Sequence, residues 1–223
     1  MTIKIVFTTQ HYSNWKSNKA SWGDVPIIEV VNIRPLTRAY NVGFVNCQTD
    51  ILGYVHDDVT CYDPNWKERV LHEFDDPQVG LVGFGGTTGH GNPQIQSLPF
   101  EWHMVGRSGT FRSNMRNAEQ HGERFTGACD AGCLDGFAMF VRRSVLEQSH
   151  GWPQDTPVKY WCYDYWISCE TRKQGKKIRV VGVDCEHTCP SEYRSYVVEE
   201  DCQAAHRWLW ENYRDTFPFE APR

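Results

Sequence analysis

Three apolar runs in this 223-residue chain end in polar residues of the kinds that bind ligands or metals. The first ends in Thr8 and Thr9, the second in His56-Asp57-Asp58, and the third leads into a segment that closes with His187. Ligands of open α/β sheets bind beyond the carboxyl ends of the strands. These three strand ends are therefore where chemistry is expected first.

The doublet Asp57-Asp58 directly follows its apolar run. Adjacent carboxylates repel each other unless a cation or a proton offsets them, and their oxygens are the ligands that hard divalent ions such as Mg²⁺ and Mn²⁺ take. Such ions keep open positions for water and substrate phosphates, which predicts a nucleotide diphosphate or triphosphate as partner. The alternative is that both aspartates cap the next turn.

The elements that would position these residues follow from the apolar patterning. Continuous apolar runs, typical of strands buried on both faces of a parallel sheet, cover residues 3–8, 27–31, 51–55, 79–84, 137–141 and 178–183. Helices are expected over 36–47, 64–74 (capped by Asp63), a short stretch after Ser144, 163–174 (closed by Gly175) and 197–213. The alternation predicts an α/β fold with a mostly parallel sheet.

Residues 85–127 interrupt this alternation with glycines, prolines and a polar, arginine-containing run. A segment of this length without clear periodicity is typical of a functional or disordered loop. The length of the whole chain fits a single domain.

Composition excludes several classes of protein. The 23 basic against 28 acidic residues give a formal charge of -5, which argues against a broadly basic, nucleic-acid-gripping surface. The nine cysteines, odd in number and without a secretory signal, predict reduced thiols and a cytoplasmic location. No apolar run approaches the roughly 20 residues of a membrane-spanning helix, so no membrane span is expected.

Four motifs, in chain order, resemble those of family-2-like glycosyltransferases with the GT-A fold. They are the run 40–58 (YNVGFVNCQTDILGYVHDD), the strand 134–143 (LDGFAMFVRR), the turn Gly151-Trp152, and the block that opens with Tyr163-Asp164-Tyr165-Trp166. His187 falls where this family has a late histidine. The order of all these features along the chain is more specific than any one of them.

The resemblance implies a Rossmann-like GT-A fold, a mixed, mostly parallel central sheet flanked by helices, in a single domain over 1–223. Residues 1–84 would form the nucleotide-sugar-binding half, 85–127 a variable acceptor-side loop, and 128–223 the acceptor and catalytic half with a C-terminal helix. The implied reaction moves a sugar from a nucleotide diphosphate sugar, expected to be a UDP-sugar, to an acceptor hydroxyl with inversion, using Mn²⁺ or Mg²⁺.

The resemblance also implies roles for single residues. Asp164 matches the general base, and its aromatic neighbours would desolvate it and make it more basic; the alternative is that it caps the helix that starts there. Asp58 and His187 would hold the metal. The donor would meet Thr8, Thr9, Asn32, Asn41, His56 and Asp57, and the sugar or acceptor would meet Asp135 and Trp161, with Trp102 as a further candidate for stacking.

Three positions depart from the family pattern. His56 replaces the first acid of the D-x-D triplet, Tyr163 replaces the glutamate of the E-D pair, and Asn32 stands where many members have an aspartate. In the family the first acid commonly contacts the donor ribose, so the resemblance assigns that contact to a ring nitrogen of His56.

The acceptor stays open between a glycan, a protein and a modified nucleic acid. If the arginines of 99–127 and the basic cluster of 172–179 share one face, a hydroxymethylated base in DNA becomes the acceptor to consider; otherwise that cluster is a solvated helix end. A nucleotidyltransferase would carry a glycine-rich basic loop after the first strand, which this chain lacks. A catalytically dead binding module would have lost Asp58 or Asp164, and both are present.

Overall fold

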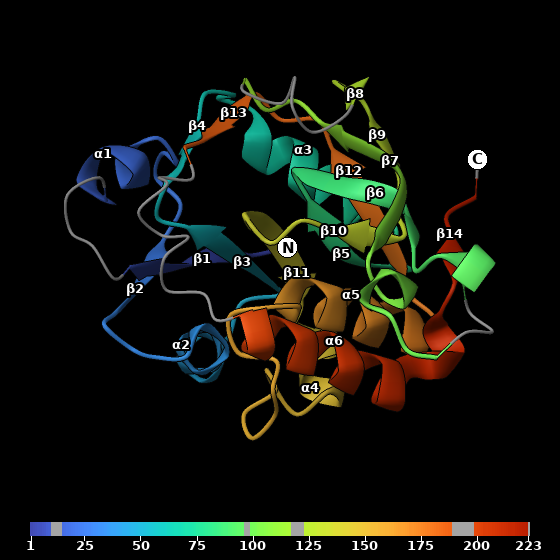
Figure 1. Cartoon of the computed structure of the whole chain (residues 1–223). Helices are drawn as coiled ribbons and strands as arrows, with labels where there is room; N and C mark the ends of the chain where they lie inside the picture. The colour runs from blue at the N-terminus through green and yellow to red at the C-terminus, as the bar shows by residue number, and fades with distance from the viewer. Residues whose placement is uncertain (10–14, 96–98, 117–122, 189–198, 223) are drawn as a thin grey trace.

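The computed structural model describes residues 1–9, 15–95, 99–116, 123–188 and 199–222 (Figure 1). Its centre is a seven-stranded sheet in the order β2-β1-β3-β11-β5-β12-β9. Strands β11 and β9 run opposite to the other five, so the predicted mixed, mostly parallel sheet is confirmed. The bounds are β1 Ile3–Thr9, β2 Ile27–Val31, β3 Ile51–His56, β5 Val79–Gly83, β9 Ala128–Asp130, β11 Ala138–Arg142 and β12 Lys177–Val181.

Helices cover both faces of this sheet, which is why its strands are apolar without alternation. On one face the helices α2, α4, α5 and α6 contribute to a core with Tyr40, Trp166 and Leu209; on the other, α3 packs Trp66 and Val70 against the sheet (Figure 1). The bounds are α1 Trp15–Ala20, α2 Leu36–Val45, α3 Trp66–Glu73, α4 Arg143–Gln148, α5 Tyr163–Lys173 and α6 Glu199–Tyr213. Short 3-10 turns lie at Pro93–Ile95, Trp102–Met104 and Arg214–Thr216.

Most predicted elements are found within two or three residues of their expected ends. Helix α5 closes at Gly175, whose φ of +69° is the left-handed geometry expected of a helix stop. The capping predictions were wrong in two places. The N-cap of α3 is Asn65, with Asp63 accepting its N–H at 2.9 Å, and α4 is preceded by Arg142 and not by Ser144. The predicted start of the last helix lies outside the described residues.

The prediction of a long loop over 85–127 was wrong for the described part of that segment. It contains strands of a second sheet in the order β10-β6-β7-β8, with β14 also pairing with β6. The bounds are β6 Gly85–His90, β7 Arg107–Ser113, β8 Glu123–Arg124, β10 Cys133–Leu134 and β14 Phe219–Glu220. Strand β6 lacks an apolar signature because its glycines allow close packing: a Cβ on Gly86 would lie 2.5 Å from the carbonyl oxygen of Cys133.

A two-stranded ribbon brings a late segment next to the end of β3. Strands β4 (Val59–Cys61) and β13 (Cys185–His187) pair antiparallel, with His187 opposite Val59. The N–H of Thr188 donates to the carbonyl of Asp58 at 3.2 Å. This ribbon is what places His187 beside the polar residues that follow β3.

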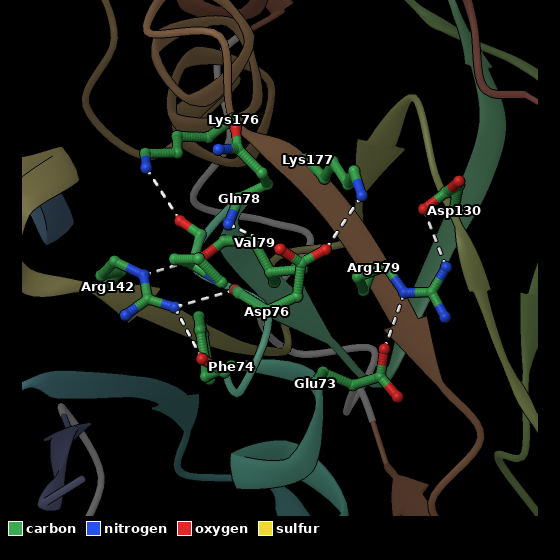
Figure 2. A network of polar contacts seen from close by, with 11 residues as sticks. Glu73, Phe74, Asp76, Gln78, Val79, Asp130, Arg142, Lys176, Lys177 and Arg179 are labelled. Atoms are coloured by element: carbon green, nitrogen blue, oxygen red, sulfur yellow. Dashed lines mark hydrogen bonds and ion pairs between the residues drawn. The ribbon is translucent and has the colours of Figure 1, made fainter.

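The basic cluster 172–179 is tied into the fold. Arg179 binds Glu73 at 2.7 Å and Asp130 at 2.8 Å, and Lys177 binds Asp76 at 2.9 Å (Figure 2). The ammonium of Lys176 donates to the carbonyl of Pro77 at 2.8 Å (Figure 2). These contacts fasten β12 and the residue before it to the end of α3, to the connection that follows α3, and to β9, so Lys176, Lys177 and Arg179 have a structural role.

Within the described ranges, no helix combines the length and the apolar character needed to cross a bilayer.

Candidate active site

Three side chains with metal-ligating atoms meet where β3 ends. The carboxylate Oδ1 of Asp58 lies 3.2 Å from His187 Nε2, and His56 Nδ1 lies 3.4 Å from that nitrogen and 4.0 Å from the same oxygen. One ligand atom from each residue lies within 4.8 Å of the other two. Asp58 and His187, predicted as metal ligands, are therefore brought together, and His56 joins them.

The donor set of this cluster fits a divalent first-row ion. Imidazole nitrogen and carboxylate oxygen are ordinary ligands of Mn²⁺ and its neighbours. Adjacent ligands of a six-coordinate ion with bonds of about 2.1 Å lie about 3 Å apart, which is close to the 3.2 and 3.4 Å separations seen here.

The three members of the cluster set one another's charge, and a metal ion at His187 would have to displace a proton. Burial acts to raise the pKa of Asp58, but the hydrogen bond and charge of His187, with the charge of His56, outweigh it and lower that pKa. Burial lowers the pKa of His56 to about 4, helped by His187, so its ring is neutral at pH 7. For His187 burial acts to lower the pKa, and the contact with Asp58 outweighs it and raises that pKa.

Tyr163 connects this cluster to helix α5. Its hydroxyl lies 2.6 Å from His56 Nε2, the ring nitrogen that faces away from His187. Tyr163 is the first residue of α5 and Asp164 is the second, so the cluster and the predicted base are joined through neighbouring residues.

Asp164 is only 9% exposed, and burial raises its pKa to about 6, partly opposed by the charge of Arg107. Its Oδ1 accepts the N–H of Tyr165 at 2.9 Å. The N-cap position of α5 is occupied by Cys162 in a left-handed conformation, so Asp164 is not the N-cap residue, although its carboxylate does accept one N–H of the first turn. The expected desolvation of this carboxylate is confirmed.

Arg107 is the site residue that sequence reasoning missed. It lies on β7, forms an ion pair with Asp135, and donates through Nε to the hydroxyl of Tyr165 at 3.3 Å. Burial acts to raise the pKa of Asp135, but the charge of Arg107 and its hydrogen bond outweigh it and lower that pKa. Nothing distinguished Arg107 from the other arginines of 85–127 because the strand that carries it was not predicted.

The predicted donor residues at the ends of β1, β2 and β3 lie together. Thr8 pairs in register with His56, and Thr9 donates through its hydroxyl to Asp57 at 2.7 Å. The N–H of Asn32, which has a φ of 56°, donates to the carbonyl of Thr9 at 3.1 Å.

Three other predicted residues have different surroundings. The side-chain oxygen of Asn41 accepts the N–H of Trp152 at 3.2 Å. A Cβ on Gly151 would lie 2.3 Å from the same oxygen, so Asn41 supports the turn formed by Gly151 and Trp152. Trp161 is half-buried against the hydrophobic core. Trp102 is 54% exposed, and its ring lies beside those of His103 and His206.

The fold and the site define a GT-A-type glycosyltransferase domain, and the comparisons with known proteins agree. A family model described as "Glycosyltransferase like family" matches residues 20–217. The chain therefore belongs to this glycosyltransferase-like family. It matches none of the curated proteins with which it was compared.

Three solved structures share the fold at low sequence identity. A197 from STIV has a TM-score of 0.53 at 8% identity and covers 85% of this chain and 87% of that one. The mannosyltransferase PcManGT from Pyrobaculum calidifontis, in complex with GDP-Man and Mn²⁺, has a TM-score of 0.55 at 11% identity. GalNAc-T7 with UDP, GalNAc and Mn²⁺ has a TM-score of 0.55 at 12% identity. The similarity covers 87% and 83% of this chain but only 59% and 43% of these two enzymes, respectively.

Proposed function

We propose that this protein is a metal-dependent inverting glycosyltransferase that moves a sugar from a nucleotide diphosphate sugar to an acceptor hydroxyl. The observation that carries the proposal is the junction at the start of α5, where Tyr163 contacts the His56-Asp58-His187 cluster and the next residue is the buried Asp164. A metal-ligating cluster and a carboxylate of raised pKa therefore adjoin each other at one edge of the sheet.

The donor side of the site would be formed by the cluster and the ends of β1 and β2. A divalent ion, Mn²⁺ or Mg²⁺, held by Asp58 and His187 would neutralise negative charge on the departing diphosphate. Thr8, Thr9 and Asn32 lie along the same edge, where the nucleoside would bind. The complexes of the two similar enzymes with GDP-Man or UDP support a nucleotide diphosphate donor, and we take a UDP-sugar as the first donor to test.

Asp164 would act as the general base. Inversion needs one group that takes a proton from the acceptor hydroxyl as its oxygen attacks the anomeric carbon. A buried carboxylate with a pKa of about 6 is more basic than an exposed aspartate, yet it is mostly ionised at pH 7. The Arg107-Asp135 ion pair borders this carboxylate, and we place the transferred sugar against it.

The acceptor would be met by the second sheet and by the aromatic residues near it. A glycan or protein hydroxyl is favoured over a hydroxymethylated base in DNA, because the basic cluster that would meet DNA phosphates is held by carboxylates and carbonyls of the fold (Figure 2). Trp102 lies in the turn between β6 and β7 and is exposed, so its ring could stack on a face of a sugar.

The experiment is a screen of UDP- and GDP-sugars for release of nucleoside diphosphate with Mn²⁺, with and without glycan and peptide acceptors. We expect release with one donor, stimulated by Mn²⁺ and by an acceptor, and inverted stereochemistry in the product. Asp58→Asn should abolish the metal stimulation, whereas the exposed control Asp155→Asn should retain it. If no nucleotide sugar releases its nucleoside diphosphate, or if the product retains the anomeric configuration of the donor, the proposal is contradicted.

A further inference from the structure

Two of the three departures from the family pattern touch each other. His56 and Tyr163 are 107 positions apart in the chain, yet His56 Nε2 and the Tyr163 hydroxyl are 2.6 Å apart. Each stands where the family has an acid. Two carboxylates at such a distance would repel, whereas an imidazole and a phenol form a hydrogen bond. The two replacements therefore suit each other.

This hydrogen bond sets the direction of the His56 ring. Because Nε2 faces Tyr163, the other ring nitrogen is turned toward the cluster, 3.4 Å from His187 Nε2 and 4.0 Å from Asp58 Oδ1. Metal-binding histidines commonly use one ring nitrogen as the ligand while the other donates to a fixed oxygen, and that contact selects the tautomer.

The oxygen that would accept this hydrogen bond is itself held in place. A Cβ on Gly136 would lie 2.1 Å from the Tyr163 hydroxyl, so the hydroxyl occupies space that only a glycine leaves open. On the other side the ring of Tyr163 meets that of Tyr40 edge to face, with centroids 5.7 Å apart. Tyr163 is 7% exposed.

From this geometry we propose that His56 is a third metal ligand through Nδ1, beside Asp58 and His187, and that Tyr163 is the positioning residue that fixes its tautomer. The inference rests on the metal site of the proposed function and adds a ligand to it. Two imidazoles and one carboxylate favour Mn²⁺ and similar first-row ions over Mg²⁺, which prefers oxygen ligands. The protein should therefore select Mn²⁺ over Mg²⁺.

The test measures binding of Mn²⁺ alone, by the electron paramagnetic resonance signal of the free ion, and repeats it with UDP and with GDP. Loss of an outer contact to a ligating histidine costs about 10–100-fold in metal affinity, and we expect that loss for Tyr163→Phe. His56→Ala should lose at least as much. The control is Tyr54→Phe, which removes the hydroxyl of another fully buried tyrosine that is not a member of the cluster.

A second measurement can be made on the unaltered protein, so its main result does not depend on whether a variant folds. Pulsed electron paramagnetic resonance of Mn²⁺ bound to the unaltered protein should show nitrogen couplings from two histidines, and from one in His56→Asp. In the same His56→Asp variant, the ratio of the affinity for Mn²⁺ to the affinity for Mg²⁺ should be smaller than in the unaltered protein. Coupling to a single histidine in the unaltered protein, or wild-type Mn²⁺ affinity in His56→Ala, would overturn the ligand assignment.

Asp58→Asn separates this inference from the function on which it rests. If Asp58→Asn weakens Mn²⁺ binding and His56→Ala does not, only the third ligand is wrong. If Asp58→Asn binds Mn²⁺ like the unaltered protein, or no Mn²⁺ binds in any of the three conditions, the metal site of the proposed function fails as well. Wild-type affinity in Tyr163→Phe would refute the positioning role alone.

Discussion

Arg107 forms an ion pair with Asp135, and the two residues join the second sheet to the candidate active site. The guanidinium also interacts with a second carboxylate, since Asp164 is within its electrostatic reach. Without Arg107, the partly buried carboxylate of Asp135 and the buried carboxylate of Asp164 would repel each other. The ion pair is therefore expected to control how easily Asp164 loses its proton.

The pH dependence of sugar transfer should report Asp164. A general base works only when ionised, and burial raises the pKa of Asp164 to about 6. We expect kcat/KM for the acceptor, measured at a fixed donor concentration, to rise with pH through about 6 and to level off above pH 7. Asp164→Asn should lose transfer at every pH while retaining donor binding by calorimetry. Normal turnover by that variant would rule out Asp164 as the base.

Arg107→Gln should move that pH profile toward higher pH. A nearby opposite charge lowers the pKa of a carboxyl group by about 1–3 pH units, and here Arg107 opposes the effect of burial on Asp164. Removing the charge should shift the midpoint upward by about one pH unit or more, and Arg107→Lys should shift it less. Arg38→Gln, at an exposed position, serves as the control. An unchanged midpoint would show that Arg107 has no electrostatic effect on the base.

Asp164→Asn should also stabilise the protein at neutral pH. A carboxyl whose folded-state pKa is raised from 3.8 to about 6 contributes stability that is fully present below pH 3.8 and is lost as the pH rises through 6. At pH 8 the cost is up to about 3 kcal/mol in the free energy of unfolding, and asparagine removes it. Urea unfolding at pH 5 and pH 8 should show a gain that is larger at pH 8. An equal effect at both pH values would mean that ionisation is not its origin.

Six of the seven strands of the central sheet were predicted, because they are continuous apolar runs. The edge strand β9 was not predicted, since its residues (ACD) are partly exposed and show no apolar run. The pairing of Asp58 with His187 followed from a family resemblance, since the β4–β13 ribbon that joins them has only three residues in each strand. The second sheet could not be predicted, because β6 (GGTTGH) is rich in glycine and β7 (RSGTFRS) is mostly polar, so neither shows an apolar pattern. Arg107 was missed for the same reason.

The contact between His56 and Tyr163 shows a second limit of prediction from the sequence. Its replacement of an acid was visible in the sequence, and so was Tyr163, but their contact across 107 positions depends on how α5 meets β3. The same holds for Asn41, whose amide supports the turn at Gly151 and Trp152. A motif fixes which residues are present near a site, and packing decides which of their atoms face one another.

Gly136→Ala should test the space that Tyr163 occupies. The new Cβ would lie 2.1 Å from the tyrosine hydroxyl and 2.5 Å from the ring carbon that carries it, so the ring must leave the position in which its hydroxyl contacts His56. Overpacking of this kind typically costs about 1–3 kcal/mol of stability. We expect that cost in thermal or urea unfolding, together with a loss of Mn²⁺ affinity similar to that of Tyr163→Phe. Gly106→Ala is the matched control, because its Cβ would meet no atom closer than 3.5 Å. A Gly136→Ala variant that is destabilised but binds Mn²⁺ normally would mean that the position of the Tyr163 hydroxyl does not matter to the metal site.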